Sequence, residues 1–198
     1  MNIWTYKDVV SRSDYFALLE EFRPEFNHWA FNKREHHSYN LDGIRIRNKV
    51  GHIPYPTWGS LIKASNRKAE QVNGLGDNLV LINIGEKLKY KASKEIGRRL
   101  KMVRVNTNIQ FPGQEGTFHY DGGSNAYTMI VMVTEGWEAQ WGGDFVCIGE
   151  DNFTTVSVPY RPNYGVLFQA NYKHRGSAPN QFSWLERKTV AFTYKEDG

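Results

Sequence analysis

The hydrophobic pattern of this chain changes its period at residue 102, and that change limits the folds available to it. From there the apolar and polar positions alternate, with Val103, Val105, Thr107, Ile109 and Phe111 set against Met102, Arg104, Asn106, Asn108 and Gln110. A period of two is typical of a half-buried strand. Further strand-like runs occupy residues 126–133, 143–148, 154–158, 165–170 and 188–194, with turn-forming residues between them. The second half of the chain is therefore predicted to consist of strands.

The first half of the chain contains mainly helical patterns. The expected elements are a helix from 11 or 13 to 22, a short strand at 44–47, a helix from 57 to 74, a strand at 79–84 and a helix over 88–100. Ser11 or Ser13 can cap the first helix, and Thr57 can cap the second. A helical half followed by a strand half predicts an α+β fold, with the helices packed on one sheet of a small β-sandwich or barrel.

Length and composition indicate one globular domain over residues 1–198. Forty per cent of the residues are hydrophobic, and the net charge of +4 comes from scattered lysines and arginines rather than a basic block. We therefore expect no nucleic-acid partner. The chain has no apolar run long enough to span a bilayer and no signal-peptide pattern, so we expect a cytoplasmic protein without a membrane contact. The single cysteine, Cys147, excludes an internal disulfide and is expected to be a small buried hydrophobe.

The triplet His119-Tyr120-Asp121 follows the first long strand. Side chains two residues apart on a strand project from the same face, so His119 and Asp121 would converge. A second imidazole, His174, lies 55 residues further on (174 − 119). Two histidines and one carboxylate form the facial triad that holds Fe(II) and leaves positions open for other ligands. Either histidine alone is more often a satisfied or exposed side chain, so the pattern depends on all three residues.

The last predicted strand places Arg187 and Thr189 on one face and Lys188 on the other. A planar guanidinium can bind a carboxylate through two hydrogen bonds, and a threonine hydroxyl can add another. This face is therefore a candidate carboxylate receptor. The alternatives are a salt bridge at the rim for Arg187 and a plain strand-forming role for Thr189.

These motifs, in this order, resemble the 2-oxoglutarate/Fe(II)-dependent dioxygenase superfamily, and within it the prolyl 4-hydroxylase-like branch. The matching segments are 111–114 (FPGQ), 119–121 (HYD), 142–145 (GGDF), 165–168 (GVLF), 174–176 (HRG) with Pro179, and Arg187-x-Thr189. They cover the second half of the chain well and the first half only loosely.

The resemblance implies a double-stranded β-helix, a jelly-roll or cupin-like core over 102–198 supported by a helical region over 1–101. It implies that His119, Asp121 and His174 are the iron ligands and catalytic residues. It further implies that Arg187 binds the distal carboxylate of 2-oxoglutarate with help from Thr189. Gln110 lies near the position of a family tyrosine and is a candidate contact to the co-substrate. Fe(II), 2-oxoglutarate, O2 and ascorbate as reductant are the expected cofactors, with succinate and CO2 as co-products.

The substrate is less constrained. A prolyl residue of a peptide or protein is expected from the resemblance, and a carboxylate at Asp121 favours hydroxylation, since related halogenases lack it. The aromatic and basic residues that could form the rim of a proline-binding groove are Trp137, Trp141, Arg161, Tyr164 and Tyr172, and burial in the interior suits them equally. The alternatives are a free amino acid or other small molecule, and a non-catalytic cupin-like barrel that binds metal or ligand. His28, His36, His37 and His52 show no pattern of metal ligands. The sequence does not indicate an oligomeric state.

Overall fold

The computed structural model describes residues 1–22, 30–32, 57–64 and 79–197 of the chain. The helices are α1 (Arg12–Glu20), α4 (Leu79–Ile96) and the 3-10 helix η1 (Ala139–Trp141). The strands are β1 (Ile3–Tyr6), β2 (Ala30–Asn32), β3 (Thr57–Ala64), β4 (Leu100–Gln110), β5 (Ala126–Met132), β6 (Phe145–Ile148), β7 (Thr155–Val158), β8 (Gly165–Gln169), β9 (Lys173–Gly176) and β10 (Arg187–Glu196). Neither α1 nor α4 is long and apolar enough to cross a bilayer.

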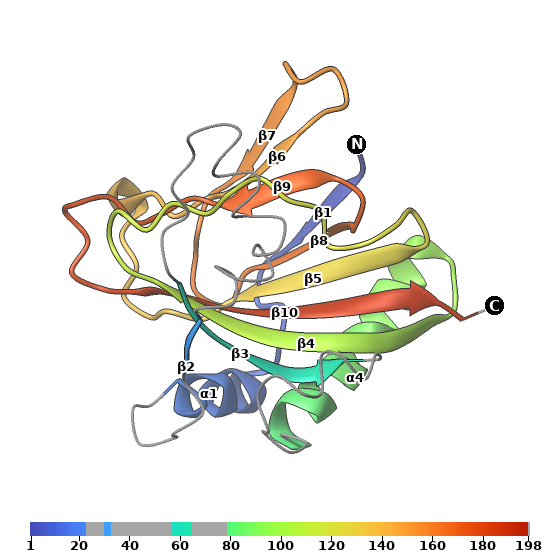
Figure 1. Ribbon diagram of the computed structural model, residues 1–198. Helices are drawn as coiled ribbons and strands as arrows, with labels where there is room; N and C mark the ends of the chain where they lie inside the picture. The colour runs from blue at the N-terminus through green and yellow to red at the C-terminus, as the bar shows by residue number, and fades with distance from the viewer. Residues whose placement is uncertain (23–29, 33–56, 65–78, 198) are drawn as a thin grey trace.

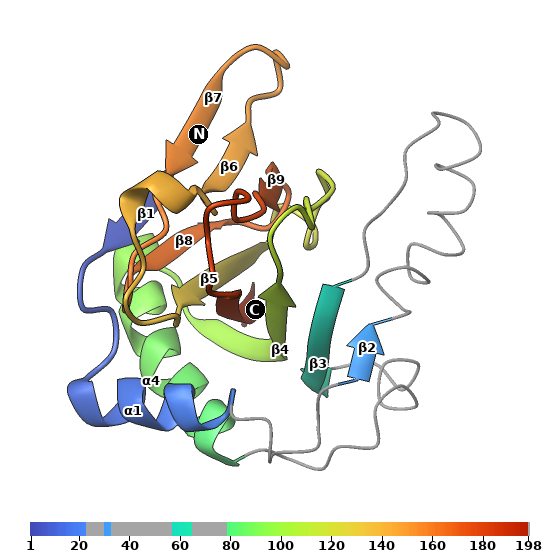
Figure 2. The ribbon, with the colours of Figure 1, turned by 90° about the vertical axis from the view of Figure 1, so that its left-hand side faces the viewer.

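The strands form two antiparallel sheets (Figures 1 and 2). The large sheet has the order β1-β8-β5-β10-β4-β3-β2, and the small sheet has the order β7-β6-β9. An isolated bridge between His119 and His174 joins the segment that follows β4 to the small sheet. Sequence neighbours such as β4 and β5 are separated in the large sheet by β10, which is the connectivity of a jelly roll rather than a meander. The predicted α+β architecture with a double-stranded β-helix core is confirmed.

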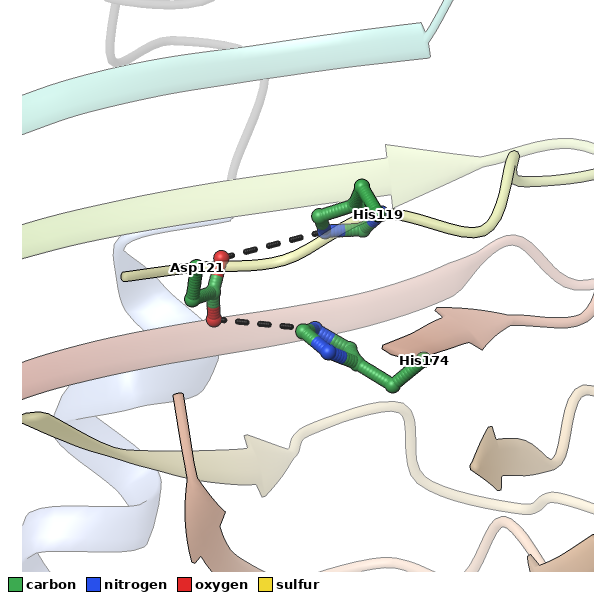
Figure 3. Close-up of side chains that lie close together, drawn as sticks. All are labelled: His119, Asp121 and His174. Atoms are coloured by element: carbon green, nitrogen blue, oxygen red, sulfur yellow. Dashed lines mark ion pairs between the residues drawn. The ribbon is translucent and has the colours of Figure 1, made fainter. Parts of the chain in front are cut away.

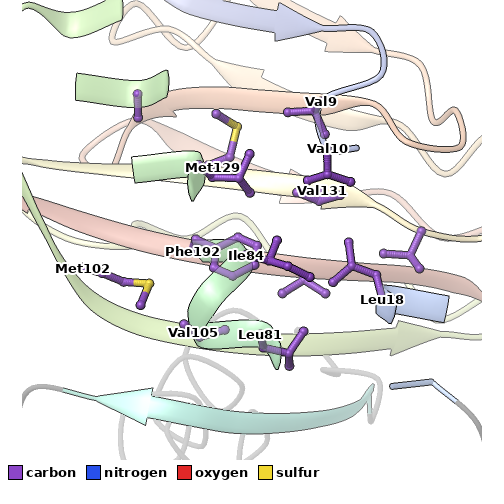
Figure 4. Packing of buried hydrophobic residues seen from close by; sticks show 14 of the residues in the cluster. Val9, Val10, Leu18, Leu81, Ile84, Met102, Val105, Met129, Val131 and Phe192 are labelled. Carbon is purple, nitrogen blue, oxygen red and sulfur yellow. The ribbon is translucent and has the colours of Figure 1, made fainter. Parts of the chain in front are cut away.

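Both long helices cover the outer face of the large sheet (Figure 2). Ser11 caps α1, because its side chain accepts a hydrogen bond from the backbone N–H of Asp14. Leu18 of α1 and Leu81, Ile84 and Leu88 of α4 are buried against β4, β5, β8 and β10 (Figure 4). This packing removes the apolar stripes of both helices from water, and burial of such side chains is the main stabilising contribution to a fold of this size.

A second core lies between the two sheets. It consists of Met132, Phe145, Cys147, Val158, Tyr160, Val166 and Phe168. Cys147 is a free, fully buried thiol, as the sequence predicted. This apolar cluster fills one side of the barrel and leaves the polar side chains of β4 and β10 on the other.

The register of the central strands separates the two faces of the large sheet. On β10, the buried residues Val190, Phe192 and Tyr194 face the helices. The inward-facing residues of β10 pair with those of β4 as Arg187 with Gln110, Thr189 with Asn108, Ala191 with Asn106 and Thr193 with Arg104. The predicted face with Arg187 and Thr189 therefore lies inside the barrel, and a mostly polar stripe from two strands lines this part of the interior.

Two segments of the first half form another element than the sequence predicts. Residues 57–64 form β3 rather than the start of a helix, because pairing with β4, such as Trp58 with Ile109, outweighs the helical spacing. Residues 79–84 form the first turns of α4 rather than a strand, since a short apolar run fits either element and packing decides between them.

The end of α4 and the N-terminal segment also differ from expectation. The helix ends at Ile96, before Gly97 with its φ of +71°, so Leu100 begins β4 instead of closing the helix. β1 adds an edge strand from the region expected to be helical support. The strand expected at 44–47 and the four histidines His28, His36, His37 and His52 lie outside the described residues.

Candidate functional site

The side chains of His119, Asp121 and His174 converge on one point (Figure 3). Their candidate ligand atoms all lie within 4.8 Å of one another. The carboxylate of Asp121 faces both rings, with its Oδ1 3.8 Å from Nε2 of His119 and its Oδ2 3.6 Å from Nε2 of His174. The sequence predicted this grouping from the two-residue spacing and the distal histidine, and the fold brings the three side chains together.

A backbone bridge sets the position of the two histidines. The N–H of His119 donates to the carbonyl of His174 at 2.9 Å, and the N–H of His174 donates to the carbonyl of His119 at 3.0 Å. The two rings consequently lie side by side, with their centroids 4.5 Å apart. Residues 55 positions apart in the chain are thus held as direct neighbours by a pair of backbone hydrogen bonds.

The tautomer of each histidine follows from its hydrogen bonds. Nδ1 of His119 lies 2.8 Å from the carbonyl oxygen of Thr117, and Nδ1 of His174 lies 2.8 Å from that of Tyr172. A carbonyl oxygen only accepts, so each Nδ1 carries the hydrogen and each neutral ring keeps its lone pair on Nε2. Both lone pairs are therefore on the nitrogens that face Asp121, which is the arrangement a metal ligand needs.

The charges of the site suit a cation. Burial of Asp121 raises its pKa, but Arg104, the two histidines and the hydroxyl of Thr128 outweigh that effect and hold the pKa well below its usual range. The carboxylate is therefore ionised at neutral pH. Burial lowers the pKa of His174 to about 4, so its ring is neutral there. Two imidazoles and one carboxylate fit a divalent metal such as Fe(II), and three protein ligands leave positions open for small ligands.

Behind this cluster, Arg187 is buried with a side chain only 3% exposed. Its Nε donates to the carbonyl of Gly143 at 2.6 Å, and its Nη1 donates to Oε1 of Gln110 at 2.8 Å. The guanidinium also lies over the ring of Tyr160, 5.2 Å from the centroid. The ion pairs found among the described residues do not include Arg187. A buried cation without a carboxylate partner is costly, and an anionic ligand would offset that cost.

The two other predicted co-substrate residues adjoin Arg187. Thr189 is buried two residues along the same face of β10, opposite Asn108. Gln110 uses its whole amide in the protein: Oε1 accepts from Arg187, and Nε2 donates to the carbonyls of Gln114 at 3.1 Å and Gly176 at 3.2 Å. In this arrangement Gln110 orients the guanidinium and has both amide hydrogens engaged.

Two glycines give the guanidinium its space. A side chain on Gly176 would come within 2.9 Å of Cζ of Arg187. Gly143, which accepts the hydrogen bond from Nε, has a φ of +78° that favours glycine. Gly143 belongs to segment 142–145 and Gly176 to segment 174–176, both of which resemble the dioxygenase motifs. Their contact with Arg187 is a physical reason for glycine at these two positions.

The sequence analysis did not identify the residues that support Asp121 and Arg187. Arg104 and Thr128 hold the two oxygens of Asp121, and Tyr160 packs on Arg187. A signal for Arg104 was present, because it is a charged residue on the polar face of the strand that leads into the H-x-D triplet. Thr128 and Tyr160 had no such signal, since their roles depend on strand register and on packing between the sheets.

The residues considered for an aromatic rim lie mostly in the interior. Trp141 is buried, and Trp137, Tyr164 and Tyr172 pack against the core between the sheets. Arg161 lies over the ring of Tyr164, 5.6 Å from its centroid. Of the two interpretations left open by the sequence, burial describes these aromatic residues better than a groove rim.

No protein-family model matches the chain, and no curated protein matches its sequence. Solved structures do match. A prolyl hydroxylase from Trichoplax adhaerens, in complex with a peptide of hypoxia inducible factor, superposes with a TM-score of 0.65 at 11% identity, covering 98% of this chain and 83% of that one. A prolyl-4-hydroxylase from Pseudomonas putida gives a TM-score of 0.63 at 13% identity, covering 98% and 92%.

A third match has another activity. The non-heme, alpha-ketoglutarate-dependent epimerase SnoN from nogalamycin biosynthesis gives a TM-score of 0.67 at 12% identity, covering 98% of this chain and 77% of that one. A further structure of the epimerase contains Fe3+, alpha-ketoglutarate and nogalamycin RO. All three identities are low, so these similarities establish the fold. The chain therefore has the fold of the 2-oxoglutarate- and iron-dependent oxygenases.

Proposed function

We propose that this protein is an Fe(II)- and 2-oxoglutarate-dependent dioxygenase that hydroxylates a C–H bond of its substrate. The observation that supports this most is the presence of two features in one barrel: the His119–Asp121–His174 cluster and the buried Arg187, which makes no ion pair with a carboxylate among the described residues. A barrel that only binds metal has no need of the second feature.

In this proposal His119, Asp121 and His174 hold Fe(II) through two Nε2 atoms and a carboxylate oxygen. When bound, iron with 2-oxoglutarate and O2 supplies the oxidising power: the substrate C–H becomes C–OH, and 2-oxoglutarate and the second oxygen atom of O2 leave as succinate and CO2. Ascorbate is the proposed reductant. The protein's contribution is to keep the imidazole of His174 neutral, to keep Asp121 ionised, and to leave part of the metal's coordination sphere open.

Arg187 is the proposed partner of the carboxylate of 2-oxoglutarate that lies away from the metal. Its guanidinium is held at Nε by Gly143 and at Nη1 by Gln110, so it is oriented before the ligand arrives. Pre-orientation lowers the entropic cost of binding. We assign Thr189 a hydrogen bond to the same carboxylate, because it lies next along the inner face. Gln110 acts by orienting Arg187.

The proposed substrate is a prolyl residue in a peptide or protein. Its support is the likeness to two prolyl hydroxylases, one of them solved with a peptide. The epimerase of the same fold was solved in complex with a small molecule, nogalamycin RO, so a small-molecule substrate is the competing possibility. Peptide and small-molecule substrates are both compatible with the same iron and co-substrate chemistry.

The experiment that tests the function measures succinate formed from 2-oxoglutarate with Fe(II), ascorbate and O2, with and without proline-rich peptides. Succinate formation stimulated by a peptide would support both the chemistry and the proposed substrate. Slow formation that no peptide stimulates would keep the dioxygenase and point to a small-molecule substrate. A folded, iron-loaded protein that forms no succinate would contradict the proposal and favour a non-catalytic metal-binding barrel.

A further inference from the structure

One cross-strand row of the large sheet leads directly to the carboxylate of the cluster. Arg104 of β4 pairs with Thr193 of β10, and Thr193 pairs with Thr128 of β5, all on the inner face of the sheet. This row lies six residues along β10 from Arg187. It therefore contacts the His119–Asp121–His174 cluster on the side away from Arg187, the proposed partner of 2-oxoglutarate.

The row holds both oxygens of Asp121. Nη2 of Arg104 donates to Oδ1 at 2.8 Å, and Oγ1 of Thr128 donates to Oδ2 at 2.8 Å. Nε of Arg104 donates to Oγ1 of Thr193 at 3.3 Å, and the two threonine hydroxyls are 3.5 Å apart, which is the longest contact of the set. The four side chains consequently form a closed ring of hydrogen bonds around the carboxylate.

Chemistry fixes the direction of every hydrogen bond in this ring. A guanidinium has only donors and an ionised carboxylate has only acceptors. Thr128 gives its hydrogen to Asp121, so it must accept from Thr193, and Thr193 in turn accepts from Arg104. Both paths run from the guanidinium to the carboxylate, one directly and one through two hydroxyls. Hydrogen bonds aligned in one direction strengthen one another.

We propose that Arg104, acting with Thr193 and Thr128, is a positioning residue that fixes the carboxylate of Asp121 for metal binding; this inference rests on the proposed function. The charged bond from Arg104 holds Oδ1 more strongly than a neutral hydroxyl holds Oδ2. In this proposal Oδ2 would be the oxygen available to the metal, so Asp121 would bind through one oxygen rather than two. The side chain of Arg104 is 32% exposed and that of Asp121 is 12% exposed, so solvent reaches this side of the cluster.

The test compares Co(II) binding by the metal-free proteins, because Co(II) is a divalent stand-in for Fe(II) that is stable in air and absorbs visible light. Affinity is measured by calorimetry, and coordination by the visible spectrum at saturating Co(II). We expect Arg104→Met to bind Co(II) 10- to 100-fold more weakly, the range typical of residues behind metal ligands. We also expect an altered spectrum at saturation, because the carboxylate is free to bind through both oxygens.

Two further variants sharpen the comparison. Thr193→Val cuts the indirect path without touching Asp121, and should weaken binding in the same direction but less. Arg104→Lys keeps the charge and one donor, and should recover part of the affinity. Arg99→Met is the matched control, since Arg99 pairs with Asp197 at 3.2 Å on an exposed surface away from the cluster. Its affinity and spectrum should equal those of the wild type.

The outcomes separate this inference from the proposed function. If Arg104→Met and Arg104→Lys both bind Co(II) as tightly as the wild type, or more tightly, with an unchanged spectrum, the positioning role is wrong and the metal site stands. If the wild type itself does not bind Co(II), the proposed function fails together with the inference.

Discussion

At the level of single residues, the cluster is open on one side and closed on the other. The side chain of His119 is 47% exposed, whereas that of His174 is 3% exposed and lies against Phe145 and Phe168. A ligand can therefore approach from the His119 side, and in the proposed function His174 is the ligand that connects the metal to the small sheet.

Replacement of His119 or Asp121 should remove activity without unfolding the protein. We expect His119→Ala and Asp121→Ala to lower succinate formation by more than about 100-fold, beyond the range typical of residues behind metal ligands. The fold should persist in His119→Ala, because truncation of an exposed side chain leaves no buried cavity. The measurement is turnover together with circular dichroism. Tyr120→Ala, an exposed residue between the two, is the control for metal binding. Full activity in either ligand variant would end the facial-triad interpretation.

His174 should make the metal-free protein sensitive to moderate acid. Its pKa falls from 6.5 to about 4 on folding because burial disfavours the charged ring. Between those two values the unfolded state binds more protons than the folded state, so stability is lost as the pH falls from about 6.5 to about 4. A difference of this size corresponds to about 3 kcal/mol of unfolding free energy.

The check is urea denaturation of the metal-free protein across that pH range, with His174→Gln as the comparison. The variant lacks the titrating ring, so its stability should change less over the same interval. Equal pH dependence in both proteins would show that His174 does not titrate as inferred.

At the level of elements, the approach of β9 to β10 depends on a glycine. A methyl group on Gly176 would come within 2.9 Å of the guanidinium of Arg187, which is the flexible end of its side chain. We expect Gly176→Ala to fold, to displace the guanidinium and to weaken 2-oxoglutarate binding by roughly 100-fold, the cost of a 1 Å misplacement. Metal binding should persist. Calorimetry of both ligands is the measurement.

Gly123→Ala is the matched control for that experiment, because a methyl group there meets only the Asn125 side chain at 3.5 Å. It should bind both ligands as the wild type does. Unchanged 2-oxoglutarate affinity in Gly176→Ala would mean that the guanidinium position does not matter for the co-substrate.

The packing of α4 on the large sheet also depends on a glycine. A methyl group on Gly85 would lie 2.5 Å from Sδ of Met102 and 2.7 Å from the ring of Phe192, both buried. Alanine favours a helix by about 1 kcal/mol over glycine, but overpacking a core costs about 1–3 kcal/mol. We expect Gly85→Ala to lower stability by about 1 kcal/mol in urea denaturation. Lys94→Ala, on the exposed side of α4, should be neutral, and a stabilised Gly85→Ala would show that the helix can move away from the sheet.

The elements of the second half were more predictable than those of the first. The alternating runs gave β4, β5, β6, β7, β8 and β10 to within a few residues. In the first half, residues 57–64 and 79–84 carry patterns that suit both helix and strand. Local pattern could not choose between them, because the deciding contacts come from β4 and from the outer face of the sheet.

At the level of the whole molecule, ligand binding should raise the melting temperature of the protein. A ligand that binds only the folded state at about 100 times its Kd adds about 2.7 kcal/mol. For a chain of this length that is roughly 5–10 °C in Tm. We expect a divalent metal to raise the Tm of the metal-free protein, 2-oxoglutarate to raise it further, and EDTA to reverse both shifts.

Variants of two adjacent residues separate the two contributions. Arg187→Ala should keep the shift caused by metal and lose the additional shift caused by 2-oxoglutarate. Lys188→Ala should keep both, because Lys188 is on the opposite face of β10. The reverse pattern would contradict the assignment of Arg187 to the co-substrate.

The sequence by itself determined which side chains share a face. Two-residue spacing put His119 with Asp121 and Arg187 with Thr189, and the order of the motifs indicated a jelly roll with a facial triad. The shared face of Arg187 and Thr189 could be predicted because strand geometry is local and regular. His119 and Asp121 lie in the segment after β4, outside a regular strand, and their role as metal ligands stays a prediction.

Only the tertiary structure decided what lies between the strands. Three contacts show this: the bridge between His119 and His174, the ring of Arg104, Thr193 and Thr128 around Asp121, and the close approach of Gly176 to Arg187. Each joins residues from separate strands or loops. Their partners depend on strand order and register, which are set by the packing of the whole barrel rather than by any local pattern.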